Sequence, residues 1–106
     1  MSVSHVNTLE VWARPGVAAH FEQDLIDLTT RLRMLPGCLE YGLRRAQGDQ
    51  QCWVLNGYWS SRKAMVQHFS SQELDELLGC LRRHSARVRF SSASTSSELE
   101  HRNGVR

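Results

Sequence analysis

Three side chains in this sequence of 106 residues could take part in chemistry at neutral pH: Asn7, Trp59 and His68. A histidine with an ordinary pKa of about 6.5 can accept a proton. An indole N–H can only donate a hydrogen bond, whereas a carboxamide can both donate and accept. Gathered around a small oxygen-bearing molecule, such groups could remove a proton and stabilise the oxyanion that develops.

Each of these residues also has a structural interpretation. Trp59 ends an expected strand, and a tryptophan at the end of a central strand often fills the core. Asn7 could occupy a turn or a strand edge, although asparagine is disfavoured in strands unless something bonds its amide. His68 could bond a backbone carbonyl at a break between two helical stretches, because it lacks a charged partner to orient it.

The other reactive groups form no recognised pattern. Cys38, Cys52 and Cys80 make an odd number without a Cys-x-x-Cys pair, so we predict neither disulfides nor a metal site, and the thiols should be reduced. With 13 Lys and Arg residues against 11 Asp and Glu, the net charge of +2 gives no reason to expect a nucleic-acid partner. The arginines at positions 82–89 are typical of a solvated face near a helix end.

Composition places the chain among ordinary globular domains. A hydrophobic share of 41% and a charged share of 23% predict folding into one domain with one core. The first residues lack a basic segment followed by an apolar run, and no stretch approaches the roughly 18 apolar residues of a membrane span. We therefore expect a soluble, cytoplasmic protein without a membrane partner.

The elements that must position these side chains follow from periodicity and turn residues. In chain order we expect a strand at 3–13, a helix at Val17–Leu35, a hairpin of 39–43 and 52–59 turning at Gly48-Asp49, a helical stretch capped by Ser60 or Ser61, a second capped at Ser70-Ser71, and a short strand at Arg87–Phe90. This order predicts an α+β fold of the ferredoxin-like kind, an antiparallel sheet with helices on one face.

The opposite sheet face needs another cover, because Cys52, Val54 and Tyr58 would lie on it. A two-fold homodimer that stacks two such faces is the economical solution, and a single exposed patch is the alternative. We expect the domain to span residues 1–92. From residue 93 to 106, Ser, Thr and charged residues predict a flexible tail.

Two segments, MLPGCLEYGLRR and WVLNGYWSSRKAMVQHFSSQELDELL, resemble the antibiotic biosynthesis monooxygenase family. The resemblance rests on Pro36-Gly37-Cys38 before a strand, on Trp59-Ser60-Ser61 after one, and on the spacing of His68 and Ser71. It implies a dimeric α+β barrel. In catalytic members it implies oxidation of aromatic or quinone-like molecules by O2, often without a metal or flavin.

For this chain the resemblance implies a cofactor-independent monooxygenase acting on a small aromatic, polyketide or quinol-type substrate. Asn7, Trp59 and His68 would be its catalytic residues, and no cofactor is expected. Tyr41, Trp53 and Phe69 would bind the substrate, although Tyr41 and Trp53 could equally belong to the core. The alternatives are a non-catalytic dimer that binds a small apolar ligand and a haem-dependent monooxygenase.

Departures from the family pattern bear on these alternatives. Haem-degrading relatives carry an iron-ligating histidine on the last helix, where residues 76–81 of this chain hold none, and His84 lies later. Leu55, four positions before Trp59, replaces a polar amide of some quinone-forming relatives. The first departure argues against haem degradation, and the second argues against a mechanism of the anthrone-oxidising type.

Overall fold

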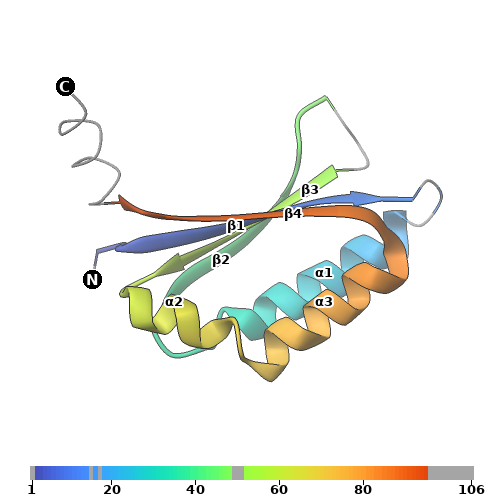
Figure 1. The fold of residues 1–106 in the computed structure, drawn as a ribbon. Helices are drawn as coiled ribbons and strands as arrows, with labels where there is room; N and C mark the ends of the chain where they lie inside the picture. The colour runs from blue at the N-terminus through green and yellow to red at the C-terminus, as the bar shows by residue number, and fades with distance from the viewer. Residues whose placement is uncertain (1, 15, 17, 49–51, 96–106) are drawn as a thin grey trace.

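The computed structural model describes residues 2–14, 16, 18–48 and 52–95. Its elements are β1 (His5–Ala13), α1 (Ala18–Leu32), β2 (Cys38–Arg45), β3 (Cys52–Trp59), α2 (Arg62–His68), α3 (Gln72–His84) and β4 (Ser85–Ser94). The strands form one antiparallel sheet in the order β2-β3-β1-β4, and the helices lie on one face of it (Figure 1). The predicted ferredoxin-like α+β fold is confirmed.

The register of the two central strands decides which side chains meet beneath the sheet. β1 pairs with β3 so that His5 lies opposite Trp59, Asn7 opposite Gly57 and Val11 opposite Trp53. Since side chains alternate along a strand, the odd-numbered residues of both strands point toward the helices. Two of the three candidate catalytic residues, Asn7 and Trp59, therefore enter the space between sheet and helices.

Helix α1 ends at Leu32, three residues before the predicted end at Leu35. A tight turn follows, in which the Leu35 N–H donates to the Leu32 carbonyl at 3.1 Å. Gly37 then adopts a φ of 80°, a left-handed conformation that favours glycine. Leu35 is the last residue of the apolar periodicity from which the helix was predicted. Pro36 disfavours helical geometry in the residue that precedes it, so the helix ends earlier.

The break between α2 and α3 comes from two serine caps. The Ser61 hydroxyl accepts from the Ala64 N–H at the start of α2, and the Ser71 hydroxyl accepts from the Leu74 N–H at the start of α3, both at 3.1 Å. These are the predicted N-caps. Because the chain stops and restarts between Phe69 and Ser71, His68 ends α2 beneath the sheet, where it is 2% exposed.

Strand β4 extends beyond the predicted Arg87–Phe90, because it pairs with β1 from Ala13 to His5. Its last residues are serines and alanine, which the sequence analysis assigned to the tail. Backbone pairing at a sheet edge does not need apolar side chains, and Thr95 N–H still donates to the Ser4 carbonyl at 2.9 Å. Ala93 and Ser94 thus belong to the sheet, and residues 96–106 of the predicted tail lie outside the described residues.

The sheet face opposite the helices carries no helix among the described residues (Figure 1). Cys52 and Val54, on the central strand β3, are 3% and 6% exposed, whereas Tyr58 is half-buried. Arg87 stacks over the Trp12 ring at 4.5 Å, and Arg89 lies 3.5 Å from Glu10. Within the described part of the chain, none of the helices has the length and apolar character needed to cross a membrane.

Candidate active site

Asn7 lies at the middle of a chain of hydrogen bonds beneath the sheet. Its side chain is fully buried, its Oδ1 accepts from Trp59 Nε1 at 2.8 Å, and its Nδ2 donates to the Tyr41 hydroxyl at 3.1 Å. These bonds connect the three strands β2, β1 and β3 through side chains. The Asn7 amide, which the sequence analysis expected to be hydrogen-bonded, therefore has two partners, Trp59 and Tyr41.

His68 continues this chain from the helical side. Its Nδ1 lies 2.9 Å from the Met65 carbonyl and its Nε2 lies 3.3 Å from the Tyr41 hydroxyl. A carbonyl can only accept, so Nδ1 carries the proton and Nε2 is the free acceptor. The Tyr41 hydroxyl then donates to His68, and the imidazole ring lies against the Trp59 indole with centroids 4.4 Å apart.

We refer to Asn7, Tyr41, Trp59 and His68 as the polar cluster. All of its hydrogen bonds run in one direction, from the Trp59 indole through Asn7 and Tyr41 to His68 and on to Met65. In a water-poor core, hydrogen bonds that follow one another in this way strengthen each other. The cluster is therefore a preorganised set of donors and acceptors.

Burial keeps both titratable members of the polar cluster neutral at pH 7. It raises the pKa of Tyr41 to about 12, because a phenolate would lose its hydration, although the hydrogen bond from Asn7 opposes this effect. Burial lowers the pKa of His68 for the same reason, against the opposing effect of the Met65 carbonyl. The cluster therefore offers an uncharged base, the His68 imidazole, next to a phenol that stays protonated.

Gly57 makes the polar cluster possible. A Cβ at this position would lie 2.3 Å from Asn7 Oδ1 and 2.8 Å from Trp59 Nε1, distances that real atoms do not adopt. The sequence analysis treated Gly57 only as one position of a strand. A glycine within a strand pattern can mark a close approach of other groups, and this was the signal available in the sequence.

The structure brings together the three predicted catalytic residues and Tyr41, but it places the other two predicted substrate-binding residues elsewhere. Trp53, at the opposite end of β3, packs edge-on against Phe21 and donates to Glu22 Oε2 at 3.1 Å. Phe69 is 36% exposed at the end of α2. Trp53 therefore lies apart from the polar cluster, and Phe69 borders it through the His68 ring, with centroids 5.1 Å apart.

Two hollows adjoin the cluster on the helical side. A small one of about 60 Å³ is lined by His68, Leu35, Pro36, Ala64, Gln67 and Ser71. A larger one of about 340 Å³ lies between α2 and β4 and is lined by His5, Arg62, Met65, Val66, Phe69 and residues 92–94. Met65 connects the larger hollow to the cluster, because it is one of the residues that line the hollow and its carbonyl accepts from His68.

The sequence model of the family described as antibiotic biosynthesis monooxygenase matches residues 4–78, a span that includes every member of the polar cluster. The chain belongs to the antibiotic biosynthesis monooxygenase family. None of the curated proteins compared with the chain matches it.

Solved structures agree on the fold. PA3566 from Pseudomonas aeruginosa is 21% identical with a TM-score of 0.75, and the alignment covers 89% of this chain and 95% of that one. Rv0793 from Mycobacterium tuberculosis is 21% identical with a TM-score of 0.74, covering 84% and 91%. A protein described as an antibiotic biosynthesis monooxygenase is 19% identical with a TM-score of 0.72, covering 86% and 95%. At these identities the similarity shows the family fold.

Proposed function

We propose that this protein is a monooxygenase that oxidises a small phenol- or quinol-type aromatic molecule with O2 and needs no metal or flavin. The observation that carries the proposal is the convergence of Asn7, Trp59 and His68 with Tyr41 in one hydrogen-bonded cluster. In such chemistry the deprotonated substrate itself reduces O2. The protein's part is to supply a base, oxyanion donors and exclusion of water.

The hollow between α2 and β4 is the proposed entry for the substrate. Its volume of about 340 Å³ lies at the lower end of the range for small-molecule sites. Met65 and Phe69 give it an apolar wall, while His5 and Arg62 add polar groups at its edge. Met65 is flexible enough to rearrange, and its displacement would open the way from the hollow to His68.

In the proposed reaction, a substrate phenol takes the place of the Tyr41 hydroxyl beside His68 Nε2 and gives its proton to this base. The amide N–H of Asn7, whose Oδ1 is held by the indole N–H of Trp59, then stabilises the phenolate oxygen. The phenolate gives electrons to O2, a new C–O bond forms at an unsubstituted ortho or para carbon, and the peroxide takes back the proton from His68 to give a hydroperoxide. Loss of water leaves a quinone, so one oxygen atom enters the product and the other leaves as water.

The test is O2 consumption by the metal-depleted protein with a panel of phenols and hydroquinones. We expect His68→Gln and Asn7→Ala to lower kcat by about 100-fold or more, since each removes a group that acts on the reacting oxygen. Trp12→Phe is the matched control, because Trp12 lies on the opposite face of the sheet. Rates equal to wild type in folded Asn7→Ala and His68→Gln proteins would refute the proposed mechanism.

A second candidate function is a non-catalytic domain that binds a small apolar ligand. It is favoured by the burial of the cluster, since Asn7 and Trp59 are fully buried and already bonded to one another. This candidate predicts that aromatic ligands bind and quench tryptophan fluorescence while no O2 is consumed. Turnover of any member of the panel would exclude it.

We also propose that the protein is a homodimer in which two helix-free sheet faces stack. Val6, Val54 and Tyr58 lie on this face of β1 and β3, which also carries Trp12. A sheet face of this kind is stabilised when a second copy covers it. Sedimentation of the dilute protein should give the mass of two chains, and Tyr58→Arg should shift it to one.

A further inference from the structure

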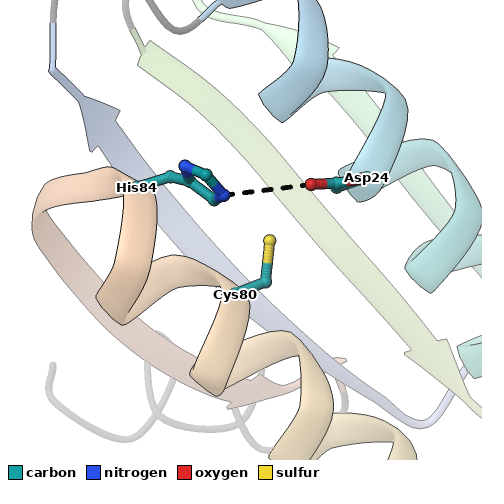
Figure 2. A group of neighbouring side chains, drawn as sticks. All are labelled: Asp24, Cys80 and His84. Atoms are coloured by element: carbon teal, nitrogen blue, oxygen red, sulfur yellow. Dashed lines mark ion pairs between the residues drawn. The ribbon is translucent and has the colours of Figure 1, made fainter.

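A second group of chemically versatile side chains lies at the other end of α3. Asp24 projects from α1, and Cys80 and His84 project from α3 toward it (Figure 2). Their ligand atoms all lie within 4.8 Å of one another, and His84 Nε2 approaches Asp24 Oδ2 to 4.0 Å. This distance is at the outer limit of an ion pair and is too long for a direct hydrogen bond.

The helices explain this convergence. Cys80 and His84 stand four residues apart on α3 and therefore share one face, one turn above the other. The facing helix α1 presents Asp24 to the same point, with Phe21 packed against the His84 ring at 5.7 Å. Cys80 is 2% exposed, while the Asp24 and His84 side chains are 48% and 31% exposed. Cys80 therefore forms the buried side of the site, and Asp24 and His84 form the side that is accessible to solvent.

The donor set is one that divalent metals of the zinc class prefer. A thiolate, an imidazole nitrogen and a carboxylate oxygen are three of the usual zinc ligands, with metal–ligand distances of about 2.0 to 2.3 Å. Ligand atoms around a tetrahedral ion of that size lie roughly 3.5 Å apart. Small rotations of exposed side chains would bring the present spacing of up to 4.8 Å to that value.

The surrounding charges fit a cation with two positive charges. The Asp24 carboxylate and a deprotonated Cys80 would balance it, while the neutral His84 imidazole adds none. Burial and the Asp24 carboxylate raise the pKa of the Cys80 thiol, against the opposing effect of Arg83, so the thiolate would form as the cation binds. A groove of about 540 Å³ between α1 and α3 leads to the site. Its charged lining residues are the acidic Asp24, Asp27, Asp75 and Glu76 and the basic Arg31, Arg82 and Arg83.

We propose that Asp24, Cys80 and His84 bind a zinc-class divalent cation through three protein ligands, with a fourth position open to the groove between α1 and α3. The site does not depend on the proposed oxygenase function, because the two sites share no residue: His68 ends α2, whereas Asp24 lies on α1 and Cys80 and His84 lie in the last turns of α3. His84 is the last residue of α3, roughly 18 Å along the helix axis from its first residue. A bound ion would connect α1 to α3.

Cobalt(II) is a suitable probe because it accepts zinc ligands and its bond to a thiolate gives a charge-transfer band. We expect the chelator-treated full chain to bind one Co²⁺ per chain, with this band and with tetrahedral d–d bands, and Zn²⁺ to displace it. Cys80→Ala should abolish the charge-transfer band. Asp24→Asn and His84→Asn should each weaken Co²⁺ binding by about tenfold or more.

Two variants serve as matched controls. Asp27→Asn removes another carboxylate that lines the same groove, and Cys38→Ser removes a half-buried thiol outside the site. Both should bind Co²⁺ as wild type does. No thiolate band in wild type, a band that survives Cys80→Ala, or equal weakening by Asp27→Asn would overturn the proposal. Because Cys80→Ala could perturb packing, the exposed Asp24→Asn variant gives an independent answer, with circular dichroism confirming its fold.

Discussion

The polar cluster and the group formed by Asp24, Cys80 and His84 both contain a histidine at the end of a helix, but they differ in how their polar atoms are satisfied. In the cluster, His68 is bonded through both ring nitrogens and lies in the core. In the second group, His84 faces a carboxylate at 4.0 Å and is partly open to solvent. The polar groups of the cluster bond one another, whereas those of Asp24, Cys80 and His84 can still bind a ligand.

This difference follows from burial. A polar group in the core must find a partner when the chain folds, or it costs about 1 to 3 kcal/mol. Asn7, Tyr41 and Trp59 therefore had to be paired with one another, whereas Asp24 and His84 can be hydrated instead. A ligand of the polar cluster must replace existing hydrogen bonds, but a cation between α1 and α3 would displace water and the Cys80 proton. Disrupting the two regions should consequently have very different effects on stability.

The largest effect is expected from Gly57→Ala. The added methyl group would clash with Asn7 Oδ1 at 2.3 Å and with Tyr41 Cε2 at 2.7 Å, and neither can withdraw without breaking the cluster. We expect the free energy of unfolding to fall by about 3 kcal/mol. Urea denaturation measures this, with Gly42→Ala as control, since a Cβ there would meet nothing within 4 Å. Equal losses of stability in Gly57→Ala and Gly42→Ala would contradict the clash at Gly57, because they would show that replacing any glycine in a strand has this effect.

Asn7→Ala should have the next largest effect. It leaves the Trp59 indole N–H buried without an acceptor and removes a donor from Tyr41. We expect a loss of about 2 kcal/mol in urea denaturation. Asn56→Ala is the matched control, because Asn56 Nδ2 donates to the Thr8 hydroxyl at 2.8 Å but both residues are only partly buried, so the hydroxyl left behind can bond water. A loss of stability in Asn56→Ala as large as that in Asn7→Ala would contradict the inference that burial makes the hydrogen bonds of the polar cluster more important than those at the surface.

His68 should make stability depend on pH in a defined direction. Burial lowers its pKa in the folded protein below the ordinary 6.5, so between these two values the unfolded chain binds more protons than the folded one. Stability should therefore fall as pH drops below about 6.5 and should rise again toward neutrality. Thermal denaturation at stepped pH measures this, and His68→Gln should flatten the slope. An unchanged slope in His68→Gln would assign it to other groups.

The sequence was sufficient to predict the order of elements, because apolar periodicity and turn residues mark each one locally. Ser61 and Ser71 are helix caps whose partners lie three residues away, so both were predictable. The end of β4 was not, since its serines carry no apolar pattern and are held by the backbone of β1. A strand that contributes hydrogen bonds but no core side chains leaves little trace in composition.

The same reasoning applies to the candidate sites. Asn7, Trp59 and His68 were selected from residue types and a family resemblance, yet their mutual bonding depends on strand register and on Tyr41 as the link. A search for Cys-x-x-Cys motifs could not find the second group. Its ligands come from two helices, with Asp24 and Cys80 lying 56 residues apart in sequence, and only Cys80 and His84 show a regular spacing.

The smallest effect should come from Asp24→Asn in the metal-free protein. Asp24 and His84 are partly exposed and 4.0 Å apart, so water screens their attraction and hydrates either partner alone. We expect the free energy of unfolding to change by less than about 0.5 kcal/mol, measured in urea with a chelator present. A loss above about 1 kcal/mol would mean that the pair holds α1 against α3 without an ion. A change near zero, together with weaker Co²⁺ binding, would separate the role of Asp24 as a ligand from any role in folding, because the same carboxylate would then matter only when the cation is present.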